Sequence, residues 1–155
     1  KNLLAVRAQL KIKFGSTLQQ VNPNALLHRA GMSAKDRDFI AKFEKIIEEH
    51  YHMTAFNRAV VADKLAVSER QLNRKLSALV DHNFADYLRK YRLRRAQELL
   101  GQGLQVSQIA ERVGFNSTSY FHVCFKEVFG SSVKSFEKIM LTDSVNADKV
   151  KITES

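Results

Sequence analysis

Four side chains that can form hydrogen bonds or carry positive charge, Arg70, Asn73, Arg74 and Lys75, are gathered in the stretch SERQLNRKL, residues 68–76. Guanidinium, amide and ammonium groups are those with which proteins contact phosphates and base edges in nucleic acids. The chemistry that this spacing favours is recognition by hydrogen bonding and charge, provided that one rigid element holds the four groups together.

The element that carries them is predicted to be the second of two short helices in residues 61–76, VADKLAVSERQLNRKL. A tight turn is expected at Ala66-Val67. Ser68 is placed to cap the second helix, and Gln71 completes a capping box three residues later. Apolar contacts that hold the two helices together are expected from Leu65, Val67, Leu72 and Leu76. This pattern is typical of a helix-turn-helix, whose second helix enters a DNA major groove by its N-terminal turns.

The composition favours a polyanionic partner. The chain has 155 residues, 45% hydrophobic content and a formal net charge of +9, which fits one domain or two small ones with a packed core. Residues 58–100 hold ten Lys/Arg and five Asp/Glu, a net of +5, so the basic excess includes the helix-turn-helix stretch and the segment after it. The single cysteine, Cys124, excludes an internal disulfide and a cysteine-based zinc cluster, which favours a reducing compartment.

Residues 2–14 are predicted to form a helix with Leu3, Val6, Leu10 and Phe14 on one stripe. This helix either packs on the rest of the fragment or serves as a connector or dimer seam that belongs to an upstream domain. A chain that begins with Lys1 is expected to be a piece of a longer protein. Neither a secretory signal nor a run of about 18 apolar residues is visible.

Two further helices are predicted after the linker around the only proline, Pro23. A helix capped by Ser33 is predicted to run to about Tyr51. A long basic helix, residues 84–100, follows a cap at Asn83. Two glycines, at 101 and 103, end it.

Catalytic and metal-binding interpretations are weak. His50 and His52 are two residues apart, so they point to different sides of a helix and cannot share a metal ion. No metal or cofactor is therefore expected. Asp63 and Glu111 occupy equivalent positions of a repeat, which argues against a catalytic pair. Cys124 is expected to be a small buried thiol, and the fragment is expected not to be an enzyme.

The helix-turn-helix pattern appears twice. Residues 61–65, VADKL, match residues 109–113, IAERV, at an offset of 48. Beyond the turn the offset becomes 49, so Ser68 matches Ser117, and the two apolar anchors Leu72 and Leu76 match Phe121 and Phe125. The chain is therefore predicted to hold two helix-turn-helix units, residues 58–80 and 106–129, joined by the helix over 84–100.

Two units on one connector suggest a single chain that reads an asymmetric site. Successive major grooves on one face of B-DNA lie about 34 Å apart. A 17-residue helix spans about 25 Å at 1.5 Å per residue, so adjacent grooves are within reach with modest bending of the DNA.

The three segments LAVSERQLNRKL, FADYLRKYRLRRAQELL and VSQIAERVGFNSTSYFHVCFKEVFGSS resemble the DNA-binding domain of AraC/XylS-family transcription regulators over about residues 38 to 138. The resemblance implies an all-α, homeodomain-like fold of seven helices and double-stranded DNA as the partner. It places the DNA-contacting positions of the first recognition helix at Ser68, Glu69, Arg70, Asn73 and Arg74. Those of the second recognition helix fall at Thr118, Ser119, His122 and Val123, with backbone contacts expected from Lys126.

The sequence departs from the family pattern at two places. Val123 stands at the position equivalent to Arg74, where the family commonly has a second arginine. A guanidinium that bonds guanine twice contributes about 1–3 kcal/mol of base discrimination, so the first unit is expected to dominate specificity. Near the end, Ser132 and Val133 replace the usual threonine and proline, and Ser132 is expected to cap the final helix.

The N-terminal helix also resembles the segment that follows a receiver domain in response regulators and hybrid sensor kinases. Residues 1–34 are accordingly assigned to a helix and linker from an upstream domain, 35–140 to the DNA-binding domain, and 141–155 to a polar tail expected to be disordered. The expected setting is the bacterial cytoplasm, with membrane anchoring if the full protein is a hybrid sensor. An upstream receiver or sensor domain, RNA polymerase and a second copy, through the N-terminal helix, are candidate partners.

An alternative function uses the same charges without reading sequence. The basic amphipathic helix over 84–100 could bind acidic protein partners or lie on a membrane surface. The alternative predicts no preference for one DNA sequence over another.

Overall fold

The computed structural model describes residues 31–142, and all the regular structure in this part of the chain is helical. Six helices are α3 (Ala34–His50), α4 (Arg58–Lys64), α5 (Glu69–Val80), α6 (Phe84–Leu99), α7 (Val106–Arg112) and α8 (Thr118–Phe129). A seventh helix covers residues 133–142. The predicted fold of two helix-turn-helix units on a connecting helix is confirmed. The N-terminal helix expected at residues 2–14 lies outside the described residues. Of the tail expected to be disordered at 141–155, residues 141 and 142 instead belong to the last helix, and the rest lies outside the described residues.

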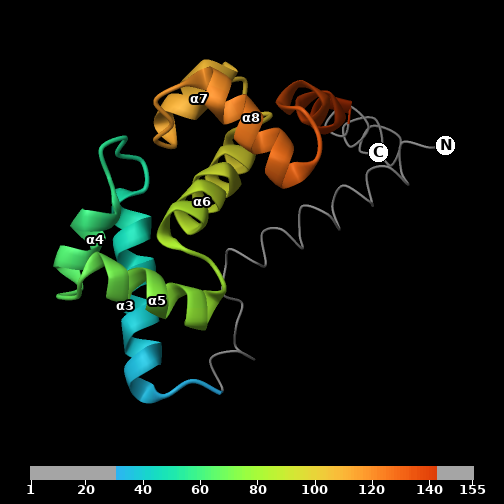
Figure 1. The fold of residues 1–155 in the computed structure, drawn as a ribbon. Helices are drawn as coiled ribbons and strands as arrows, with labels where there is room; N and C mark the ends of the chain where they lie inside the picture. Colours follow the sequence, from blue (N-terminus) through green and yellow to red (C-terminus); the bar gives the residue numbers. More distant parts are fainter. Residues whose placement is uncertain (1–30, 143–155) are drawn as a thin grey trace, which may run out of the picture.

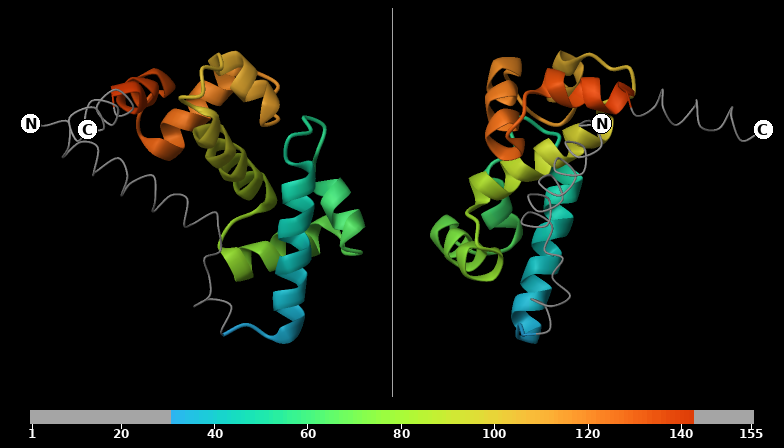
Figure 2. Two further views of the ribbon diagram at one scale, coloured as in Figure 1. Left: turned by 180° about the vertical axis from the view of Figure 1, so that it is seen from behind. Right: turned by 90° about the vertical axis from the view of Figure 1, so that its right-hand side faces the viewer.

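The first unit consists of α3, α4 and α5, and α6 begins against it. In Figure 1, α4 and α5 lie in front of α3, and the rear view in Figure 2 shows α3 nearest the viewer. All three helices contribute buried side chains to the core of this unit. These side chains are Phe39, Ile40, Phe43 and Ile47 on α3, Val61 and Ala62 on α4, and Leu72 and Leu76 on α5. Burial of this apolar surface fixes the orientation of α5 relative to α3.

The second unit is built in the same way from α7, α8 and the helix over 133–142. Its core is rich in phenylalanine, which supplies bulk in a chain without tryptophan. The fully buried members include Ile109 on α7, Phe121, Cys124, Phe125 and Phe129 on α8, and Val133 on the last helix. The thiol of Cys124 is buried, as the sequence predicted.

Helix α6 belongs to both units. Its first half adds Phe84, Tyr87 and Leu88 to the core of the first unit. Its second half adds Leu93 and Ala96 to the core of the second. A helix that is embedded at both ends in packed side chains is a rigid spacer rather than a flexible linker. Figure 1 shows α6 running diagonally from one unit to the other.

The two turns have the same geometry. Ala66 has φ 55° and Gly114, its equivalent in the repeat, has φ 98°. The next residue closes each turn with an equivalent hydrogen bond, from Val67 N–H to Ala62 O at 3.0 Å and from Phe115 N–H to Ala110 O at 2.9 Å. The turn predicted at Ala66-Val67 is therefore present, and its geometry recurs in the second unit.

The predicted helix caps are also present. The amide of Asp36 donates to Ser33 Oγ at 3.2 Å, and that of Asp86 donates to Asn83 Oδ1 at 2.9 Å. Ser132 accepts from the amide of Ser135 at 3.2 Å and so caps the last helix without the family's proline. Each cap satisfies an amide that has no partner inside its own helix.

Candidate nucleic-acid interface

The start of α5 is fixed by a complete capping box. The amide of Gln71 donates to Ser68 Oγ at 3.1 Å, and the amide of Ser68 donates to Gln71 Oε1 at 3.1 Å. Arg70 and Arg74 are exposed on the outer face, one helical turn apart, while Leu72 and the following anchor are fully buried on the inner face. The two guanidinium groups are therefore held on a rigid helix and point away from the core.

Glu69 is paired within the protein. Arg58 Nε donates to Glu69 Oε2 at 2.6 Å, which joins the first residue of α4 to the first residue of α5. The carboxylate adds a favourable charge at a helix N-terminus. Because Arg58 compensates its charge, Glu69 presents less repulsion to a polyanion than an isolated carboxylate would.

Asn73 has a structural contact that the sequence did not predict. Its Oδ1 accepts a hydrogen bond from the Phe84 amide at 3.1 Å, so it joins α5 to the first turn of α6. Asn73 is half-buried, unlike Arg70 and Arg74. Its amide nitrogen keeps both donors for a base edge, while one of the two lone pairs of Oδ1 is used by this contact. Lys75 lies on the inner side as well, with Nζ 4.7 Å from the centre of the Phe39 ring.

The outer face of α8 carries most of the other predicted contact residues. The Ser117 hydroxyl caps this helix by accepting from the Tyr120 amide at 3.2 Å. Thr118 is half-buried at its first position. The exposed members of the predicted set are Ser119, His122, Val123 and Lys126.

Tyr120 is a surface residue of α8 that the sequence analysis did not select. Its side chain is 51% exposed, and the offset of 49 residues that relates the two units pairs it with Gln71. Applying that offset to every exposed position of α5 would have found it. A hydrogen bond and a charge interaction with the Cys124 side chain raise the pKa of Tyr120, with a smaller contribution from burial, and Arg89 acts in the opposite direction. The phenol is therefore neutral at physiological pH.

A cleft of about 670 Å³ separates the N-terminal turns of α5 and α8. Its lining includes Arg58, Glu69, Asn73, Arg89, Asn116 and Tyr120. Arg89 forms ion pairs with Asp86, one turn earlier on α6, at 2.9 Å and with Glu127 of α8 at 3.7 Å. The cleft thus separates two outward-facing helices and has both polar and apolar walls, and two of its arginines, Arg58 and Arg89, are paired with carboxylates.

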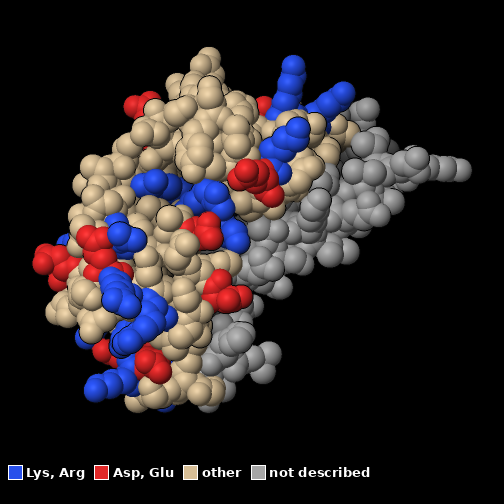
Figure 3. Space-filling view, in the orientation of Figure 1, with Lys and Arg blue, Asp and Glu red and all other residues tan. Residues whose placement is uncertain are grey.

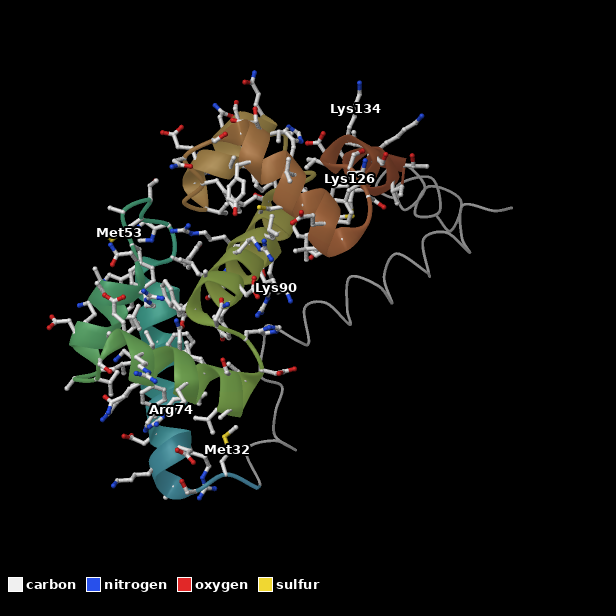
Figure 4. The ribbon with its side chains drawn as sticks, viewed as in Figure 1. Met32, Met53, Arg74, Lys90, Lys126 and Lys134 are labelled. Atoms are coloured by element: carbon white, nitrogen blue, oxygen red, sulfur yellow. The ribbon has the colours of Figure 1, made fainter. Side chains whose placement is uncertain are left out.

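Both recognition helices lie on one face of the molecule, at the left of the right-hand view in Figure 2. On that face, Lys and Arg side chains gather over α5 and α6 and again near α8 and the last helix, with acidic side chains among them (Figure 3). Figure 4 shows Arg74 on α5, Lys90 on α6 and Lys126 on α8, so basic groups occur on three helices of this face. A distribution of this kind can attract the sugar-phosphate backbone along the length of the face.

His50, the last residue of α3, has a packing role. His50 Nδ1 lies 3.0 Å from Ile46 O, and its ring stacks on Phe56 with 5.5 Å between the ring centres. Among residues 31–142, no group of three or more His, Cys, Asp or Glu side chains is arranged to hold a metal ion. Within the same residues, none of the helices has both the length and the apolar character that crossing a bilayer requires.

Comparison with known proteins agrees with this geometry. Residues 61–139 match the family described as "Helix-turn-helix domain". The chain belongs to this family and is a DNA-binding transcription regulator domain of the AraC type.

Similar proteins include a histidine kinase, P4, of Formosa agariphila, which is 30% identical over 138 residues covering 88% of this chain and 10% of that protein. The C-terminal domain of the two-component response regulator YesN of Fusobacterium nucleatum is 32% identical, with a TM-score of 0.59 over 61% of this chain and 93% of that chain. The DNA-binding domain of the transcriptional factor AdpA, solved in complex with a target DNA, is 26% identical, with a TM-score of 0.60 over 63% of this chain and 88% of that chain. Other curated relatives are also longer, since the chain spans between 29% and 41% of their lengths.

Proposed function

We propose that α5 and α8 enter two successive major-groove segments of one asymmetric DNA site. The observation that carries this proposal is the equivalence of the two helices, each capped by a serine and each following a turn with the same hydrogen bond. Helix α6 has 16 residues, which is about 24 Å at 1.5 Å per residue. A separation of this order between α5 and α8, extended by the side chains that reach from each helix into its groove, is compatible with adjacent major grooves about 34 Å apart.

Within this site, the first unit carries most of the base discrimination. Arg70 and Arg74 are exposed, and each guanidinium can bond to guanine O6 and N7. The equivalent residues of α8 are Ser119 and Val123, which cannot replace those contacts. Lys126, on the outer face of α8, contributes a phosphate contact that does not depend on sequence.

The remaining predicted contact residues take narrower roles. Ser68 caps α5, and Glu69 orients Arg58. Ser68 and Glu69 therefore act beside the DNA backbone and do not contact base edges. Asn73 contributes its amide nitrogen while its oxygen remains bonded to Phe84. Thr118 and His122 contact the backbone beside the second groove.

The domain acts as the output of a two-component signalling protein. Support comes from similarity to a histidine kinase over 88% of this chain and to the C-terminal domain of a response regulator. In that setting residues 1–34 connect to an upstream receiver or sensor domain, and residues 35–140 form the DNA-binding domain. Its site of action is the cytoplasm, where chromosomal DNA is available. RNA polymerase and a second copy of the protein are partners in the regulated promoter complex.

The experiment that tests the proposed function has two stages. Duplexes bound by the 155-residue chain are selected from a random library, and the selected duplex is compared with a scrambled one by fluorescence anisotropy across a salt series. Specific binding predicts a higher affinity for the selected duplex at every salt concentration, with both affinities falling as salt rises. Equal affinities throughout would instead favour a non-specific basic interaction module.

A further inference from the structure

The outer face of α8 exposes large hydrophobic side chains, and that of α5 does not. Among the described residues, the large hydrophobic side chains that are exposed on a recognition helix are Tyr120 at 51% and Val123 at 54%. They are three residues apart and therefore neighbours on one helical face. We call them the apolar strip of α8. The corresponding residues of α5 are Gln71 and Arg74, which are polar.

The orientation of Val123 is set by its neighbours in the core. Phe121 and Phe125 are fully buried on either side of it, as Leu72 and Leu76 are on either side of Arg74. Because the inner anchors match, the outer residues of α5 and α8 project equivalently from their units. If Arg74 meets base edges in one groove, Val123 meets base edges in the next.

An isopropyl group can form favourable contacts with only one group on those edges. In the major groove guanine, adenine and cytosine present hydrogen-bond donors and acceptors beside small aromatic C–H groups, whereas thymine also presents its C5-methyl group. Phosphate oxygens would lose hydration against valine without gaining a partner. The chemistry of the apolar strip therefore matches a thymine.

We propose that Val123 reads the C5-methyl group of a thymine in the half-site bound by α8, within the apolar strip that it forms with Tyr120. This inference rests on the proposed two-groove function and adds a specific base preference to its weaker half. The second unit then recognises its half-site by apolar contact with a methyl group, whereas the first unit recognises its half-site by guanidinium hydrogen bonds.

The test removes the methyl group from the DNA without changing base pairing. Each thymine of the selected second half-site is replaced in turn by deoxyuridine, and affinity is measured for the 155-residue chain. Burying one methyl group corresponds to about a fourfold change in affinity. We expect one replacement in the second half-site to weaken binding by about fourfold.

Variants of the protein assign the effect to Val123. Val123→Ala should bind thymine and deoxyuridine duplexes with nearly equal affinity at that position, whereas Val123→Thr, which keeps one methyl group, should retain part of the difference. Arg74→Ala is the matched control, because it acts in the other groove and should leave the thymine-to-deoxyuridine ratio unchanged. Circular dichroism verifies that each variant remains folded.

The possible failures are distinguishable. A selected second half-site without thymine, or deoxyuridine replacements that change affinity by less than about 1.5-fold, would overturn the inference and leave the two-groove function standing. Retention of the full ratio by Val123→Ala would also overturn it. A library that yields no preferred sequence would contradict the proposed function itself.

Discussion

The guanidinium of Arg92, on α6, donates from Nε to the carbonyl oxygen of Tyr51 at 2.8 Å, which ties the connecting helix to the end of α3. Its Nη2 also donates to Met53 O at 2.9 Å. A Cβ atom added to Gly114 would lie 2.5 Å from the same Tyr51 oxygen and 2.8 Å from Arg92 Nε. The first unit, the connecting helix and the turn of the second unit therefore meet at this one point.

The junction should contribute to stability. Burial lowers the pKa of Arg92, but the guanidinium remains charged at neutral pH. Arg92→Lys keeps the charge but loses the planar fork that reaches two carbonyl oxygens. We expect the free energy of unfolding, measured by urea denaturation, to fall by about 1.5–3 kcal/mol. Arg94→Lys is the control, because Arg94 Nε lies 3.9 Å from Glu98 Oε1 at the surface; an equal loss there would contradict the assignment.

Equivalent turn positions should respond in opposite directions. Gly114→Ala adds a Cβ at φ 98° and against Tyr51 O, so we expect a loss of about 2–4 kcal/mol in unfolding free energy. Ala66→Gly relieves a left-handed conformation at φ 55°, and its gain is partly offset by greater freedom of the unfolded chain. Its expected effect is between zero and about 1 kcal/mol of stabilisation. Thermal and urea unfolding of both variants measure this difference, and a clear destabilisation by Ala66→Gly would be inconsistent with it.

Asn73 should matter for stability as well as binding. Asn73→Ala leaves the Phe84 amide without its acceptor, and we expect a loss of about 1–2 kcal/mol in unfolding free energy. Asn73→Asp keeps an acceptor oxygen and should retain most of the stability. Affinity for the selected duplex is measured on both variants. A stable Asn73→Ala variant with altered base preference would mean that base contact, not the hydrogen bond to α6, is the main role.

Arg74 and Lys126 should affect DNA binding in different ways. Arg74→Ala should relax base preference at one position of the first half-site, by about 1–3 kcal/mol of discrimination. Lys126→Ala should weaken binding to all duplexes alike and reduce the slope of log affinity against log salt by about 0.9. Repeating the library selection with each variant separates the two effects. An unchanged consensus for Arg74→Ala would contradict the dominance of the first unit.

Local sequence signals were sufficient for the helices and their caps. Ser33, Ser68, Asn83 and Ser132 all cap the helices that their spacing predicts, because a cap depends on the next three residues alone. The recurrence of the motif also predicted the two units, since each must bury the same anchors. Helix α6 ends at Leu99, one residue earlier than expected.

Contacts between distant parts of the chain were not predictable from the sequence. Asn73 bonds to Phe84, 11 residues away, and Arg92 bonds to Tyr51, 41 residues away. Neither pair has a characteristic spacing, because each depends on how whole helices pack. The sequence predicts Arg92 only as a basic residue of an amphipathic helix, and Asn73 only as a DNA-contacting residue of the first recognition helix.

Moving the half-sites apart tests whether one chain reads two grooves at a fixed spacing. Affinity is measured for the selected duplex and for duplexes with about 5 or about 10 base pairs, a half or a full helical turn, inserted between the half-sites. A rigid α6 predicts that both insertions reduce affinity to that of the first half-site alone. Recovery of full affinity with the full-turn insertion would contradict a rigid α6, because it would mean that the two recognition helices are not held at one fixed separation.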